Sequence, residues 1–207
     1  MEFEFDLENP FPPSDQNFPS MLFGNETDHM PSQSYIQKLM LESADSEMIS
    51  TRRREAVSSI LRLHRNDGDQ SVRYLAINYM DRFVSSHSMQ VGKPWMLKLV
   101  AVSCVILAFK MLRPESVVPV PLLQEDGDYI FDLFTIKRME LIILEALRWR
   151  MRSINPFSFL NYFISLFEFK EERPSIQTLK HRATEIILKS QNGDSPVSEM
   201  PSPVVRM

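Results

Sequence analysis

The residues in this chain that could most clearly take part in binding or catalysis are charged side chains on helical faces that are otherwise apolar. Arg53 lies three, four and seven residues before apolar side chains, so helical spacing turns it inward. Asp81 follows Ile77 by four residues and precedes Val84 by three, and it also leans inward. Because an unpaired buried charge is costly, we predict an Arg53–Asp81 ion pair that joins two helices. The alternative is that both side chains extend their charged ends to water.

A second pair of charges has a less determined role. Lys110 closes the apolar run 95–109, and Glu140 is in line with Ile136 and Ile143 on a later helix. These two residues could pair with each other, could each lie at the rim of a helical bundle, or could together bind a partner. Spacing alone leaves the three alternatives open.

The sequence lacks the patterns that usually support catalysis or metal binding. The five glycines are isolated, so no phosphate-binding loop is expected, and no serine lies in a nucleophile turn. Cys104, the single cysteine, is predicted to be buried and unreactive. The four histidines share no metal-ligand spacing; they are His29, His64, His87 and His181. We therefore expect a binding protein with no catalytic residue, no metal and no cofactor.

Composition and charge limit the compartments and partners. The lone cysteine fits a reducing compartment. Residues 1–37 hold seven acidic residues and no lysine or arginine, so the net charge of −4 conceals an acidic tail and a mildly basic remainder. Two short arginine groups, 52–54 and 148–152, are too small for a strong phosphate-binding surface, and we expect no nucleic acid partner. No signal peptide opens the chain, and the apolar run contains Lys98, so we expect no membrane segment.

Helical periodicity predicts an all-α protein, and residues 50–150 show no strand-like alternation. We expect a short helix at 34–43 and then five helices, at about 52–65, 69–86, from Pro94 to 110, around 115–125 and 135–150. The third is apolar on nearly every face, which places it at the centre of the bundle. An aromatic helix at 156–169 and another helix to about 189 follow, and residues 1–33 and 190–207 read as disordered tails.

Four ordered motifs resemble the cyclin box of plant D-type cyclins. They are the segments 53–61, 79–83 (Tyr-Met-Asp-Arg-Phe), 99–110 and 138–141. The segments 147–151 and 155–160 resemble the same family's passage into its second cyclin fold. The resemblance covers about residues 34–189 and is strongest to the divergent D-six subgroup. It implies a cyclin box at 34–152, a five-helix bundle around a buried central helix, and a partial second fold at 153–189.

The resemblance also implies a function. A cyclin binds a cyclin-dependent kinase and shifts it toward its active conformation. Lys110 and Glu140 match the family's kinase-contacting lysine and glutamate, while Arg53 and Asp81 match its internal ion pair. The implied protein is a regulatory subunit of the cell cycle, of the G1/S type, and acts in the nucleus. It is not itself an enzyme.

The chain departs from the family pattern in three ways. With Cys104 as its only cysteine, it holds no Leu-x-Cys-x-Glu motif for docking retinoblastoma-type proteins. Ser59 stands where the family usually has tryptophan in the substrate-docking groove, which puts that groove, with Ala56, in doubt. Only 53 residues run from Asn155 to Met207, too few for a complete second fold, so the aromatic helix is expected to expose apolar surface.

Alternative functions remain open at this point. The chain could be a truncated adaptor or competitor that occupies a kinase without activating it. It could also be a transcription-associated helical scaffold that uses its acidic, phenylalanine-containing tail as an interaction segment. Ser195 and Ser202, each followed by proline, are candidate phosphorylation sites.

Overall fold

The computed structural model describes residues 27–41, 44–63, 70–86, 93–115, 129–152, 154–165 and 176–192. Within these ranges the regular structure is entirely helical. The elements are η1 (Thr27–His29), α2 (Gln33–Met40), α3 (Ala44–Leu63), α4 (Gln70–Ser86), α5 (Pro94–Leu112), α6 (Leu133–Ala146), α7 (Pro156–Ser165) and α8 (Ile176–Asn192). The predicted all-α class is confirmed.

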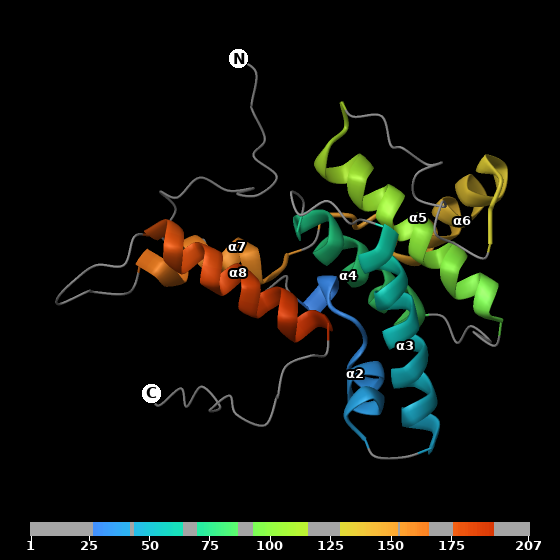
Figure 1. Ribbon diagram of the computed structural model, residues 1–207, viewed down its shortest axis with the longest axis horizontal. Coiled ribbons are helices and arrows are strands. Elements are labelled where there is room, and N and C mark those ends of the chain that lie inside the picture. Colours follow the sequence, from blue (N-terminus) through green and yellow to red (C-terminus); the bar gives the residue numbers. More distant parts are fainter. Residues whose placement is uncertain are drawn as a thin grey trace.

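Helix α5 is the centre of the bundle, as its uniform apolarity predicted. It packs against α3, α4 and α6 (Figure 1), and every residue from Leu99 to Ala108 is buried. Pro94 occupies its first turn, where a missing backbone N–H breaks no helical hydrogen bond. Within the described residues, α5 is long and apolar enough to span a membrane, even though it contains Lys98. Most of it lies inside the bundle, as in the core helix of a folded domain.

Two helix boundaries differ from the predicted ones for reasons of local chemistry. Helix α6 begins at Leu133 rather than 135 because Asp132 acts as its N-cap and accepts a hydrogen bond of 2.9 Å from the Thr135 backbone N–H. The Thr135 hydroxyl also donates to Asp132, and the bonds from this hydroxyl and from the backbone N–H lower the pKa of the exposed Asp132 carboxyl. The helix ends at Ala146 rather than 150, because the backbone of Arg148 and Trp149 adopts a left-handed conformation.

The ends of the described chain are more ordered than predicted. Residues 27–29 form a short 3-10 helix inside the predicted tail 1–33, and α8 continues to Asn192, past the predicted limit of 189. Helix α3 begins at Ala44, eight residues before the predicted start, where it packs against α2. The predicted element at 115–125 lies almost entirely outside the described residues, as do Ser195 and Ser202.

Helices α7 and α8 lie side by side as an antiparallel-looking pair at one flank of the bundle (Figure 1). Phe159 is buried, whereas Phe163 is 46% exposed and Ile186 is 57% exposed. The predicted aromatic helix therefore forms over 156–165 and leaves part of its apolar surface uncovered. Helix α8 also contacts α4, which fixes this pair against the bundle.

Candidate functional site

The predicted Arg53–Asp81 ion pair is present and links α3 to α4. The Arg53 guanidinium donates from Nε to Oδ1 of Asp81 at 2.9 Å and from Nη2 to Oδ2 at 2.8 Å. This two-point geometry is the strong form of a guanidinium–carboxylate interaction. Both side chains are largely buried, with 16% and 10% of their surfaces exposed. The alternative in which both extend to water is thereby excluded.

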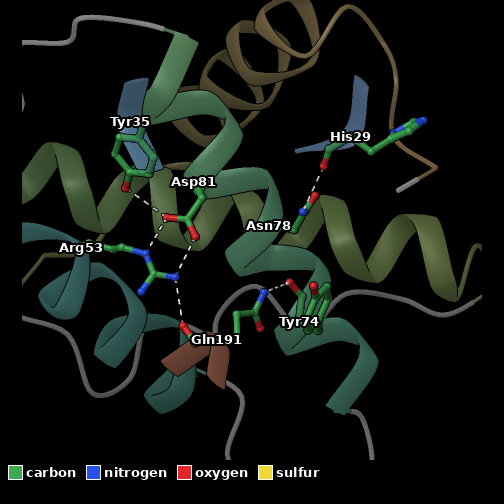
Figure 2. Close-up of polar contacts among 7 residues, drawn as sticks. All are labelled: His29, Tyr35, Arg53, Tyr74, Asn78, Asp81 and Gln191. Carbon is green, nitrogen blue, oxygen red and sulfur yellow. Dashed lines mark hydrogen bonds and ion pairs between the residues drawn. The ribbon is translucent and has the colours of Figure 1, made fainter. Parts of the chain in front are cut away.

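Two further residues complete this ion pair (Figure 2). The Tyr35 hydroxyl, from α2, donates to Oδ1 of Asp81 at 3.1 Å, and Arg53 Nη2 donates to the Gln191 carbonyl of α8 at 3.0 Å. The side chain of Gln191 in turn donates to the Tyr74 carbonyl of α4 at 2.9 Å. We call Tyr35, Arg53, Asp81 and Gln191 the polar cluster. It joins three consecutive helices, α2, α3 and α4, to α8, which lies far from them in the sequence.

The charge states of the polar cluster are set by burial and by Asp81. Burial alone would lower the pKa of Arg53, but the hydrogen bonds and charge of Asp81 outweigh it and raise that pKa. Burial and the nearby Asp81 carboxylate both raise the pKa of Tyr35, which keeps its hydroxyl protonated. Arg53 therefore stays a cation and Tyr35 a hydrogen-bond donor across the physiological range.

Lys110 and Glu140 pair with each other, which selects one of the arrangements left open by the sequence. Lys110 Nζ donates to the two Glu140 carboxylate oxygens at 2.9 and 2.7 Å. The two partners differ in exposure, because the Glu140 side chain is 8% exposed and that of Lys110 is 50% exposed. The pair thus joins a buried carboxylate on α6 to a half-exposed lysine side chain in the last turn of α5.

The helix that carries Glu140 also exposes several large apolar side chains. On α6, Leu133 is 59% exposed, Phe134 is 76% exposed and Leu141 is 58% exposed. Helical spacing places these three residues on the face that Glu140 borders, while Ile136 and Ile143 turn toward the core. We call Leu133, Phe134 and Leu141 the apolar ridge. An ion pair within such a ridge is typical of a protein-binding surface.

The described residues hold no candidate metal site and no accessible thiol. They contain no group of three or more His, Cys, Asp or Glu side chains that could hold a metal ion. Cys104 is fully buried, and burial raises its pKa, so the thiol is protonated and inaccessible.

Comparison with known proteins identifies this arrangement. The family described as "Cyclin, N-terminal domain" matches residues 18–152, well over half of the chain. The chain belongs to the cyclin family. Its relatives place it among the plant D-type cyclins, since a putative cyclin-D6-1 of Arabidopsis thaliana is 45% identical over 203 residues, covering 92% of the chain.

Other D-type cyclins show the same relationship. Cyclin-D2-2 of Oryza sativa subsp. japonica is 37% identical and covers 94% of the chain, and cyclin-D6-1 of the same organism is 36% identical and covers 92%. The chain spans 62%, 53% and 57% of the lengths of these three relatives. It therefore corresponds to about half to three-fifths of a curated D-type cyclin.

The two residues of the doubtful docking groove occupy different environments in this cyclin. Ala56 is only 2% exposed and belongs to the hydrophobic core, so its side chain does not line an open groove. Ser59 is half-buried, and its hydroxyl donates to the Glu55 carbonyl one turn earlier at 2.9 Å. A serine bonded to its own helix offers no apolar anchor, so a substrate-docking role for this position remains a prediction with no support in the geometry.

A feature that sequence reasoning missed lies in the turn after α6. Arg148 and Trp149 have φ angles of 51° and 59°, a left-handed conformation that costs a residue with a Cβ about 1–2 kcal/mol. Backbone bonds hold this turn, including one of 2.9 Å from the Trp149 N–H to the Leu144 carbonyl. Trp149 is nevertheless 66% exposed. The three arginines at 148, 150 and 152 were noted in the sequence, but no sequence signal indicated the left-handed backbone of Arg148 and Trp149 or their exposure.

Proposed function

We propose that this cyclin binds a cyclin-dependent serine/threonine kinase and regulates it in the cell cycle at the G1/S transition. Its membership in the D-type cyclins supports a regulatory role rather than an enzymatic one. The observation that carries the proposal is the Lys110–Glu140 pair at the edge of the apolar ridge. We assign these two residues and the ridge to the kinase-binding surface.

The geometry of the pair suits backbone recognition. The Lys110 ammonium has three N–H donors, and Glu140 accepts from it through both carboxylate oxygens. Since half of the Lys110 side chain is exposed, the ammonium can donate to a partner carbonyl while Glu140 holds it in place. Glu140 would thus orient Lys110, and the exposed ring of Phe134 would supply the apolar anchor that such interfaces need.

Activation requires more than binding. A regulatory subunit shifts a kinase toward its active conformation only by the difference between its affinities for the active and inactive states. Because the chain spans about half the length of its curated relatives, a second candidate function is binding without activation, as an adaptor or competitor.

Co-purification with a cyclin-dependent kinase, scored for binding and for phosphorylation of a histone substrate, tests the proposal. We compare the unchanged chain with Lys110→Ala/Glu140→Ala and with Phe134→Ala. The matched control is Lys180→Ala/Glu185→Ala, which removes an exposed lysine and glutamate from α8. Loss of an interface anchor of this kind weakens binding by about tenfold to a hundredfold, which corresponds to about 1.4–2.7 kcal/mol.

The outcomes separate the candidate functions. Binding and phosphorylation that both disappear in the first two variants, and persist in the control, support a kinase-activating cyclin. Binding without phosphorylation supports the adaptor or competitor. Binding that the variants leave unchanged would refute the assigned surface, and no binding would favour the transcription-associated scaffold.

Nuclear localisation is part of the same proposal and is tested by imaging a fluorescent fusion in plant cells.

We further propose that the protein has no nucleic acid or membrane partner and no direct retinoblastoma-type docking through Leu-x-Cys-x-Glu, since the chain holds no such motif. A pull-down with a retinoblastoma-type protein in the absence of kinase checks the last point, and recovery of that protein would contradict it.

A further inference from the structure

The turn after α6 presents arginine and tryptophan side chains to solvent in a rigid frame. Arg148 and Trp149 are exposed, and both have a left-handed backbone directly after the end of α6. Arg148 has no ion-pair partner among the described residues. We call residues 148–150 the Arg-Trp-Arg turn.

The backbone beneath this turn is fixed from the bundle side. Arg82 of α4 donates to the Arg150 carbonyl at 3.0 Å, and the buried Tyr79 hydroxyl donates to the Met151 carbonyl. Met151 itself is buried in the core. Because the frame is set by these contacts, the exposed side chains of the turn are not needed to hold it. A strained and exposed turn of this kind is more often a binding element than a packing element.

The turn already binds one carboxylate. Asp28, at the start of the described chain, forms an ion pair of 2.6 Å with Arg150 Nη1. The adjacent His29 carbonyl accepts a hydrogen bond of 3.3 Å from Asn78 of α4, three residues before Asp81 on the same helix (Figure 2). Asp28 therefore lies at the Arg-Trp-Arg turn, and residues 1–26 come directly before this part of the chain.

That segment has the chemistry the turn would select. Residues 1–26 contain six acidic residues, five phenylalanines and no lysine, arginine or histidine. Carboxylates complement exposed guanidinium groups, and phenylalanine complements an exposed indole ring. Glu26 precedes Asp28 by two residues, so an extended chain separates them by at most about 7 Å. Tethering also gives the segment an effective concentration in the millimolar range near the turn.

The geometry points to an intramolecular docking surface, in which the Arg-Trp-Arg turn binds the acidic, phenylalanine-containing segment 1–26 of the same chain. Asp28 on Arg150 is the first contact of this surface, and Arg148 and Trp149 receive the acidic and aromatic residues that precede it. The surface shares no residue with the Lys110–Glu140 pair or the apolar ridge, so its test does not require a kinase.

Quenching of Trp149 fluorescence tests this interaction in the full chain. The chain has two tryptophans, so Trp95→Phe leaves Trp149 as the only emitter. A nitroxide, which quenches tryptophan on contact, is attached through Ser14→Cys in the acidic segment. The matched control carries the same label through Ser198→Cys near the other end. Cys104 is buried and does not take the label.

We expect the label at position 14 to quench Trp149 about three- to tenfold more than the control label, as a few exposed ion pairs would produce. The excess should disappear in Arg148→Gln/Arg150→Gln and at about 1 M salt, where charges are screened beyond about 3 Å. Arg54→Gln/Arg62→Gln, which removes two exposed arginines of α3, should keep it. Thermal melts establish that each variant is folded.

Three results would overturn the inference. The first is equal quenching from the two labels, and the second is excess quenching that survives the loss of Arg148 and Arg150. In the third, a labelled chain without tryptophan (Trp95→Phe/Trp149→Phe) quenches an unlabelled chain at the same concentration. That result would assign the interaction to a second copy instead of the same chain.

Discussion

The two ion pairs of this cyclin use similar charges in different surroundings. Arg53 and Asp81 lie inside the bundle, where Tyr35 and Gln191 use their remaining hydrogen-bonding capacity. Lys110 and Glu140 lie at the rim, where only Glu140 is buried and the neighbouring side chains are exposed and apolar. Pairing alone therefore does not distinguish a structural charge from a recognition charge. The exposure of the cation, and the groups around it, do.

The largest effect should come from Arg53→Ala. It leaves Asp81 buried without its cation and also removes the donor to the Gln191 carbonyl, so we expect a loss of about 3–5 kcal/mol in the free energy of unfolding. Urea denaturation measures it. The control is Arg54→Ala, an exposed neighbour that donates to the Thr51 hydroxyl at 3.2 Å and should cost less than about 0.5 kcal/mol. Equal losses from Arg53→Ala and Arg54→Ala would show that the Arg53–Asp81 pair is no more stabilising than an exposed arginine contact.

Lys110→Met should cost less, although it too leaves a buried carboxylate without its cation. Because half of the Lys110 side chain is exposed, water can reach the Glu140 oxygens that lose their donor, and we expect a loss of about 1–2 kcal/mol. Methionine keeps the length of the lysine stem. The comparison variant is Lys137→Met, which removes an exposed lysine of α6. A loss as large as that of Arg53→Ala would show that the rim pair is as structural as the interior one.

A single hydrogen bond of the polar cluster is isolated by Tyr35→Phe. This change removes only the hydroxyl that donates to Asp81, so the ring still packs and the free energy of unfolding should fall by about 1 kcal/mol. The raised pKa of Tyr35 gives a second measurement. Burial raises the pKa of Tyr79 as well, so an ultraviolet titration of the folded protein should lack the transitions of both Tyr35 and Tyr79 up to pH 11, and both should appear on unfolding. Titration of all tyrosines near pH 10 in the folded state would contradict the buried bond.

The smallest effect concerns pH and His29. Burial, followed by the charge of Arg82, lowers the pKa of His29 below its usual 6.5. The folded state thus binds this proton less readily than the unfolded state. The contribution of His29 to the free energy of unfolding should therefore be fully present above pH 6.5 and be lost as the pH drops below it. Replacing His29 with asparagine should flatten this part of the stability–pH curve. A curve unchanged by the replacement would place the pH dependence elsewhere.

Much of the fold followed from periodicity because the bundle is built around one uniformly apolar helix. The inward positions of Arg53 and Asp81 also followed, since helical spacing fixes which face a residue occupies and burial demands a partner. Spacing could not pair Lys110 with Glu140, because their contact depends on how α5 crosses α6. The resemblance to cyclins supplied their proposed role.

Other features of the structure could not be predicted from the sequence pattern. Gln191 fell in a segment whose serine, glycine and proline content suggested a disordered tail, and its contact with Arg53 joins residues 138 positions apart. The left-handed turn at Arg148 and Trp149 was hidden because glycine, the usual residue for that conformation, is absent there. Ala56 was placed in a groove by family analogy, whereas the packing of α3 puts it in the core.

The bond from Arg53 to the Gln191 carbonyl has a consequence for how the protein is made. Arg53 and Asp81 are 28 residues apart and can meet as soon as α4 has left the ribosome, but Gln191 is added about 110 residues later. At about 5–20 residues per second, the guanidinium waits several seconds for its last acceptor. The polar cluster is therefore completed only after α8 has been translated, well after the other three helices that contribute to it.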